Sequence, residues 1–230
     1  MINNVLLLTI KSTLFQGLKF NFLERYWPYY LRGLGMTLRL AFFAVLIGTL
    51  LGIIIGMMRL SKVKAVHWVA TGWVNFVRGI PVMLQIFIIY YGLASNMSDF
   101  WAAVCALSVN SSAYIGEHIR AGIQAVDKGQ TEAARSLGMT HFQNMMIIVI
   151  PQAIKNILPS LVNEFILLIK NTSIVSIIGL HELMYLSNTV RANTYLAFEP
   201  LICAAVVYFC VTYVLKKLVG IMERRLQASD

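Results

Sequence analysis

Residues 34–58 read LGMTLRLAFFAVLIGTLLGIIIGMM, and Arg39 is the only charged residue among them. A helix needs about 20 consecutive, mostly apolar residues to cross the hydrocarbon core of a bilayer. The rest of the chain has the same character, because 58% of its 230 residues are hydrophobic and only 13% are charged. About a quarter of a soluble domain is charged. The sequence therefore predicts an all-α integral membrane protein.

Four more apolar runs follow, at residues 65–93, 100–123, 142–169 and 200–215. Pro81 lies in the second run of the chain, and Pro151 and Pro159 lie in the fourth. Proline removes a backbone donor and disfavours helix at the residue before it, so both helices are expected to be broken. The five runs predict five transmembrane helices.

Residues 1–230 are expected to form a single transmembrane domain. Residues 1–32 contain an apolar stretch with no small-residue cleavage site after it. We therefore interpret them as an N-terminal interfacial segment and not as a cleavable signal peptide.

Basic residues cluster at the ends of the apolar runs and give the chain a net charge of +9. They favour anchoring at a membrane face over binding to nucleic acid. Three clusters mark cytoplasmic loops: Arg59, Lys62 and Lys64; Arg120, Lys128 and Arg135; Lys216, Lys217, Arg224 and Arg225. They predict an outside N-terminus and an inside C-terminus in the cytoplasmic (inner) membrane. Four basic residues before position 33 do not fit this orientation, because they would lie outside.

The longest polar stretch inside the chain, residues 127–141, contains Glu132-Ala133-Ala134-Arg135-Ser136-Leu137-Gly138. Nine residues separate Gly138 from Ile148-Val149-Ile150-Pro151. This spacing resembles the EAA---G---------I-LP signature of permease subunits of ABC importers, with Ile150 where leucine is usual. The resemblance implies that residues 127–141 are the cytoplasmic loop that couples the permease to an ATPase.

The chemistry of this loop suits a docking element. Glu132 is favoured near a helix N-terminus, and Gly138 permits the left-handed backbone of a tight turn. Ala133 and Ala134 would let the backbone of a partner approach closely, while Arg135 and Pro151 complete the predicted coupling set. The alternative is a solvated amphipathic helix with no partner.

Residues 77–81 and 163–173 also resemble the polar amino-acid branch of these permeases, which imports histidine, arginine and glutamine. The resemblance runs from about Leu31 to Glu223. It implies the ABC type I importer permease fold, a second permease subunit (a copy or a paralogue), two ATPase subunits and an extracytoplasmic solute-binding protein. The chain has no GxxxxGK[ST] loop, so ATP and magnesium are expected on the ATPases. We expect this transport subunit to have no catalytic residue and no cofactor of its own.

Polar residues form one stripe on the fourth apolar run. Charged groups at membrane depth are costly and tend to face a cavity or a partner. A zwitterionic amino acid needs a cation for its carboxylate and acceptors for its ammonium group. We therefore predict a substrate site with Arg78 and Glu164 as its poles. Its other predicted members are Asn163, Ser160 and Thr172.

The carboxylate of Glu164 favours a cationic substrate such as arginine, histidine or lysine. Alternatively, Arg78 and Glu164 pair with each other or with Lys170 and only hold the bundle together. Glu117, His118 and Arg120 end the third run, and we expect a solvated helix end there, with a charged hinge as the alternative.

Two other function classes compete with the importer. A secondary amino-acid transporter or channel would use intramembrane carboxylates as ion sites, but the chain lacks the inverted repeat expected of such a protein. A membrane enzyme would need clustered ligands or a nucleophile with a base. The four histidines and three cysteines are scattered, so neither an enzyme nor a metal site is predicted.

Overall fold

All the regular elements of the described structure are helices, as predicted. The computed structural model describes residues 18–94 and 96–227, and no β-strand occurs among them. The α-helices are α2 (Leu23–Leu60), α3 (Lys64–Gly79), α4 (Val82–Phe87), α5 (Asp99–Gln124), α6 (Lys128–Ser136), α7 (His141–Asn144), α8 (Ile150–Asn171), α9 (Leu183–Thr194) and α10 (Glu199–Gln227). The π-helical segments Ile88–Leu93 and Met145–Val149 and the 3₁₀ segment Thr172–Ile178 extend α4, α7 and α8.

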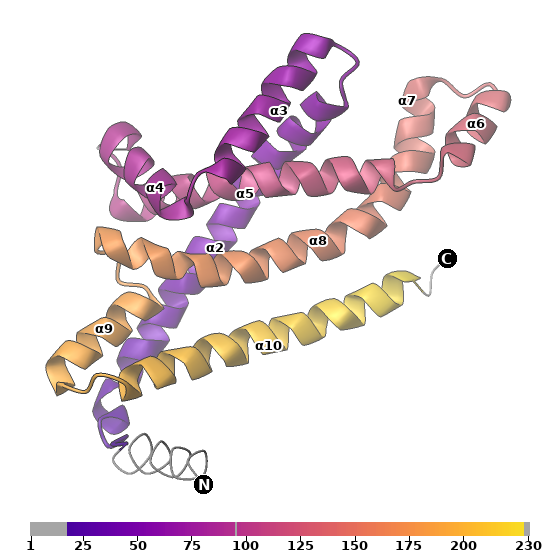
Figure 1. Cartoon of the computed structure of the whole chain (residues 1–230). Helices are drawn as coiled ribbons and strands as arrows, with labels where there is room; N and C mark the ends of the chain where they lie inside the picture. Colours follow the sequence, from indigo (N-terminus) through magenta and orange to yellow (C-terminus); the bar gives the residue numbers. More distant parts are fainter. Residues whose placement is uncertain (1–17, 95, 228–230) are drawn as a thin grey trace, which may run out of the picture.

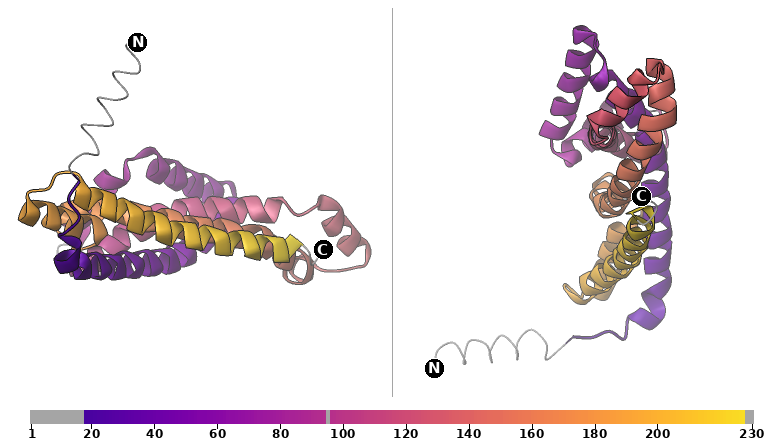
Figure 2. Two further views of the ribbon diagram at one scale, coloured as in Figure 1. Left: turned by 90° about the horizontal axis from the view of Figure 1, so that it is seen from below. Right: turned by 90° about the vertical axis from the view of Figure 1, so that its right-hand side faces the viewer.

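Helix α2 is the longest element, and the other helices lie along one side of it (Figures 1 and 2). It packs most extensively on α5 and also contacts α3, α8 and α9. Gly48 and Gly52 lie in the α2–α5 interface, where a Cβ atom on Gly52 would lie 2.6 Å from the Cγ2 of Ile115. In lipid, small residues allow such close helix packing, which is then stabilised mainly by van der Waals contact.

Three helical stretches are long and apolar enough to cross a membrane: Leu23–Leu60, His141–Ile178 and Glu199–Arg224. A fourth span results if Lys64–Gly79 and Val82–Leu93 are taken together. The remaining long helix, α5, does not meet this criterion of composition. The described residues thus provide three or four of the five predicted spans by length and composition.

The predicted break at Pro81 is confirmed, because the helix axis bends by 106° between α3 and the helix that follows. The predicted break at Pro159 is wrong, because α8 continues through this residue from Ile150 to Asn171. Pro151 is the second residue of α8 and directly follows the π-helical segment Met145–Val149, so the helix passes through this proline as well. Membrane helices tolerate an interior proline when local adjustments and neighbouring groups satisfy the freed backbone.

The boundary of the N-terminal segment also differs from the prediction. Helix α2 begins at Leu23, so the last residues of the predicted interfacial segment 1–32 belong to the first long helix. Pro28 lies inside this helix, which continues through it. Residues 1–17 of the predicted segment lie outside the described residues.

Helices α6 and α7 project from one end of the bundle, beyond α5 and α8 (Figure 1). The end of α10 points toward the same side, whereas α9 and the start of α10 lie at the opposite end (Figure 2). The predicted coupling loop and α9 therefore lie at opposite ends of the bundle.

Candidate functional site

The loop with the EAA pattern folds as a helix, a turn and a second helix. Asp127 caps α6, because its Oδ1 accepts a hydrogen bond of 2.7 Å from the backbone N–H of Gly129. At the other end Gly138 has φ +79°, a left-handed conformation that favours glycine. The N–H of Met139 donates to the carbonyl of Ala134 at 3.1 Å and closes the turn. The predicted role of Gly138 as a turn residue is therefore present in the geometry.

A capping box starts α7. The backbone N–H of Thr140 donates to Oε1 of Gln143 at 2.9 Å, and the N–H of Gln143 donates to Oγ1 of Thr140 at 3.3 Å. The helix then continues without a break from His141 to Ile178. The start of α7 and the middle of α8 therefore belong to one continuous helix.

The coupling residues divide into an inner and an outer set. Ala134 is 1% exposed, so it packs within the chain and is not available for the close approach of a partner. Buried Asn144 donates through Nδ2 to Oγ1 of Thr131 at 3.3 Å and joins α7 to α6. Glu132, Ala133, Arg135 and Gly138 are exposed. We call residues 127–144 the coupling knob.

Two apolar side chains of the coupling knob were missed by the sequence analysis. Leu137 is 83% exposed and Phe142 is 71% exposed, one on each side of the Gly138 turn. Large apolar side chains held in the open within a polar segment are typical of a binding surface. Leu137 could have been noticed within the polar stretch 127–141, whereas Phe142 was counted as the first residue of the apolar run 142–169.

An ion-pair cluster ties together two helices near the end where the coupling knob lies. Glu117 of α5 accepts from Arg59 at the end of α2 and from Arg120 one turn further along α5. The side chains of Glu117 and Arg59 are only 25% and 12% exposed. The expected solvated helix end is therefore wrong, because tertiary packing brings the end of α2 against Glu117.

The broken helix at Pro81 is held by a glutamine that the sequence analysis did not single out. Gln85 is buried, and its Nε2 donates to the carbonyls of Val77 and Ile80 at 2.7 and 2.8 Å. Asn110 of α5 donates to Oε1 of Gln85 at 3.2 Å. These bonds satisfy carbonyl groups that the break would leave without partners in a medium poor in water.

The predicted substrate residues do not all meet within one chain. Arg78 is exposed at the end of α3, and its guanidinium carbon lies 5.1 Å from the centre of the Tyr114 ring on α5. Glu164 lies on α8 and is 4% exposed. Helix α3 packs on α2 and α5, whereas α8 packs on α5, α2 and α10. In the part of the chain that the structure describes, Arg78 and Glu164 pair neither with each other nor with Lys170.

The remaining predicted members also face different environments. Ser160 is half-buried and Asn163 is exposed, both on α8. Thr172 is fully buried and donates to the carbonyl of Ile169 at 2.8 Å. The predicted members therefore include an exposed amide, a half-buried hydroxyl, a buried carboxylate and a buried hydroxyl that is bonded to the backbone.

Comparison with known proteins gives this geometry its context. Residues 48–228 match the family described as the inner membrane component of binding-protein-dependent transport systems. The chain belongs to this family. The resemblance stated from the EAA pattern is therefore confirmed. The family consists of membrane permease subunits of ABC importers, whose ATPase is a separate subunit, so the chain is a transport subunit and not an enzyme.

Among curated members, the chain is 41% identical over 207 residues to the arginine transport system permease protein ArtQ of Bacillus subtilis. This match covers 88% of the chain and 94% of ArtQ. The probable glutamine ABC transporter permease protein GlnM of the same organism is 39% identical over 203 residues, covering 87% of the chain and 94% of GlnM.

Solved structures of permeases agree with these relatives. A crystal structure of an amino acid ABC transporter with histidines contains a chain that is 47% identical and superposes with a TM-score of 0.86. That superposition covers 91% of this chain and 99% of the other. An inward-facing methionine ABC transporter is 18% identical, with a TM-score of 0.77, over 86% of this chain and 96% of its own. It shares the fold alone.

Proposed function

We propose that this permease imports a polar amino acid, with arginine, histidine or lysine preferred, driven by ATP hydrolysis on partner subunits. The family assignment and the named cargoes of its relatives support an amino acid. The preference for a cation rests on Glu164, a carboxylate with 4% exposure on a helix within the bundle. A carboxylate shielded from water attracts an ammonium or guanidinium group that comes next to it.

The proposed assembly contains two permease subunits, which are two copies or two paralogues, each with five transmembrane helices. Helix α5 would be the fifth span despite its polar residues, because Ser108, Asn110 and Ser111 are buried against neighbouring helices. The N-terminus would lie outside and the C-terminus inside. The coupling knob and the end of α10 lie at the same end of the bundle (Figure 2). In the proposed orientation, both are in the cytoplasm.

The observation that carries the proposal is the connection between the coupling knob and the proposed site. Glu132, Ala133, Arg135 and Leu137 are presented outside the bundle. The helix that leaves the coupling knob reaches Glu164 without interruption. An ATPase that binds the coupling knob and closes on ATP would therefore move the helix that carries the substrate carboxylate, and the cavity would change its accessible side.

The function is tested by reconstituting the permease in vesicles with its ATPase and its solute-binding protein. Uptake of arginine, histidine, lysine and glutamine would be measured with ATP inside the vesicles. We expect ATP-dependent uptake of at least one cationic amino acid, with glutamine transported less well. Uptake that continues without ATP, or in response to an ion gradient alone, would refute an importer driven by ATPases.

The site is tested by replacing Glu164 with Gln. A hydrogen bond to a charged group contributes about 1.5–3 kcal/mol, so arginine uptake should fall about tenfold or more while glutamine uptake changes less. Glu223→Gln, in the last helix, is the control. Unchanged uptake and unchanged selectivity in Glu164→Gln would remove Glu164 from the site without affecting the family assignment.

A further inference from the structure

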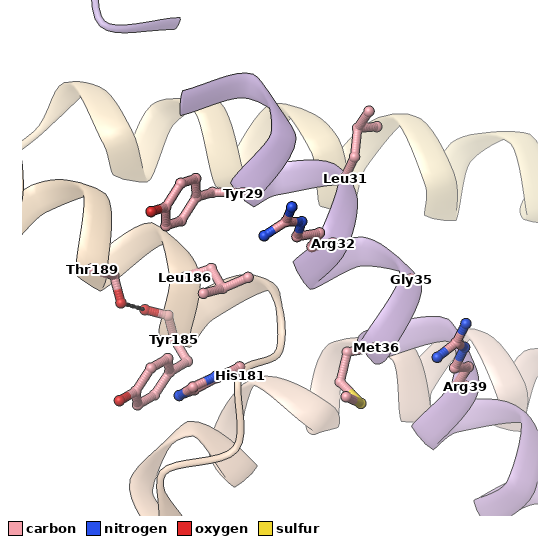
Figure 3. Close-up of a pocket in the computed structure, with 10 residues that line it drawn as sticks. All are labelled: Tyr29, Leu31, Arg32, Gly35, Met36, Arg39, His181, Tyr185, Leu186 and Thr189. Carbon is pink, nitrogen blue, oxygen red and sulfur yellow. Dashed lines mark hydrogen bonds between the residues drawn. The ribbon is translucent and has the colours of Figure 1, made fainter. Parts of the chain in front are cut away.

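A groove of about 780 Å³ lies between the first part of α2 and α9, at the end of the bundle opposite to the coupling knob. Figure 3 shows Tyr29, Arg32 and Arg39 on α2, with His181 and Tyr185 across from them. We call this space the α2–α9 groove. It is open, and it combines two guanidinium groups with phenol and imidazole rings.

Among the residues that the structure describes, no acidic side chain pairs with the two arginines of the groove. Arg32 and Arg39 are exposed, and both ion pairs of residues 18–94 and 96–227 involve Glu117, which lies elsewhere. They are seven residues apart, so they project from similar faces of α2 two turns from each other. Their charges are therefore available to an anion in the groove.

The sequence of α2 places the groove at a defined depth. Residues 40–58 contain no charged side chain, and at 1.5 Å per residue they extend about 28 Å. This length matches the hydrocarbon core of a bilayer, about 30 Å. Arg39 consequently lies at the boundary of the core, and Arg32 lies about 10 Å further along the helix, in the layer of the headgroups.

We propose that the α2–α9 groove binds the phosphate of an anionic phospholipid headgroup, such as phosphatidylglycerol. Guanidinium groups bind phosphate oxygens through paired hydrogen bonds, and Tyr29 and Tyr185, which also line the groove, carry hydroxyl groups that can donate. Two cations against one phosphodiester leave an excess positive charge, so a lipid with net negative charge is preferred to a zwitterionic one. The lipid belongs to the outer leaflet in the orientation proposed above, but its binding does not depend on that orientation.

The variant that tests the proposal is Arg32→Gln/Arg39→Gln in the purified permease–ATPase complex. Arg25→Gln is the matched control, since Arg25 is an exposed arginine of α2 whose guanidinium lies over the ring of Tyr26 and not in the groove. Delipidated complexes would be titrated with phosphatidylglycerol, phosphatidylcholine or inorganic phosphate. Bound lipid would be counted by native mass spectrometry, and the melting temperature would be followed in parallel.

Each arginine near an anionic surface contributes roughly a fivefold increase in affinity. The double variant should therefore bind phosphatidylglycerol roughly thirtyfold more weakly, while the wild type and Arg25→Gln should bind it in preference to phosphatidylcholine. Arg32→Lys/Arg39→Lys keeps both charges and should recover most of the affinity. This variant also shows that the replaced positions tolerate substitution.

Four results would overturn the proposal. The double variant could retain its lipid, or the wild type could bind the two lipids equally. Inorganic phosphate could compete fully at millimolar concentration, in which case the groove would be a site for soluble phosphate. Finally, the double variant could lose its second permease subunit or its response to the binding protein while lipid binding persists. The groove would then face a protein.

Discussion

Gly33 tests the packing of α2 on α9. A Cβ atom at Gly33 would lie 2.7 Å from the Cα of Leu183, 3.0 Å from its N and 3.2 Å from the carbonyl carbon of Glu182. All three atoms belong to the backbone, so no rotamer change can relieve the contact. Ordinary van der Waals contact begins at 3.4 Å, and the two helices must therefore separate by about 0.7 Å to admit one methyl group.

The start of α9 cannot easily make this movement. The N–H of Leu183 donates to Oγ1 of Thr37 on α2 at 3.3 Å, and a separation of this size would break that bond. Overpacking costs about 1–3 kcal/mol and a lost hydrogen bond about 1 kcal/mol. Alanine returns about 1 kcal/mol of helix propensity. We therefore expect Gly33→Ala to destabilise the protein by about 1–3 kcal/mol.

Gly35→Ala is the matched control. It lies two residues further along α2, and nothing is within 4 Å of its Cβ position, so only the gain in helix propensity of about 0.5–1 kcal/mol applies. The two variants should differ by about 2–4 kcal/mol. At 2–4 °C for each kcal/mol in a chain of this size, Gly33→Ala should melt roughly 4–16 °C below Gly35→Ala.

The assay is thermal unfolding of the purified permease–ATPase complex in one detergent and at one scan rate, because the unfolding of such complexes is commonly irreversible. Intrinsic tryptophan fluorescence reports the transition. Equal melting temperatures for the two variants, or a higher one for Gly33→Ala, would contradict the close approach of α2 to the backbone of α9.

Three further outcomes are expected. Gly138→Val places a β-branched residue in a left-handed conformation at a cost of about 1–2 kcal/mol. Because this strain disturbs the turn of the coupling knob, the variant should hydrolyse ATP without uptake. Gly138→Asn should stay coupled, because asparagine tolerates this backbone, and normal uptake by the valine variant would count against the turn. Burial raises the pKa of Glu182 to about 7 although Met184 and Tyr185 donate to it. Glu182 therefore contributes its full stabilisation below about pH 4.5, where its carboxyl is protonated in both the folded and the unfolded state. The stabilisation falls by about 3 kcal/mol as the pH rises through 7. The melting temperature of Glu182→Gln should lack this fall with pH. Gln85→Leu leaves two carbonyls at the Pro81 break without a donor and should lower the melting temperature, because each unsatisfied buried group costs about 1–3 kcal/mol. An unchanged melting temperature for Gln85→Leu would show that the break does not need this donor.

The coupling knob illustrates how far a pattern in the sequence extends. The order of Glu132, Gly138 and Pro151 predicts a helix, a turn and a second helix, because each residue acts on its own stretch of backbone. The structure has this arrangement. The sequence did not predict which side chains of the loop are buried, because Ala133 and Ala134 are neighbours of the same type. Only the tertiary structure shows that Ala134 is buried and Ala133 is exposed.

The substrate residues show the opposite case. Arg78 and Glu164 were paired on chemistry alone, and the structure places α5 between the helices that carry them. Within one chain, Arg78 and Glu164 therefore do not meet as the two poles of the predicted substrate site. The Glu164→Gln experiment tests this part of the proposal.

The sequence by itself determined the lipid environment, the helical class and the positions of most helices, because burial in lipid demands long apolar runs whose backbone bonds close within each helix. It also determined the left-handed turn at Gly138 and the bend at Pro81, which are local properties of glycine and proline. Only the tertiary structure decided that α8 continues through Pro159, that Glu117 joins two helices, and that Gly33 meets the backbone of α9. These contacts join residues far apart along the chain, and their geometry depends on how close whole helices can approach one another.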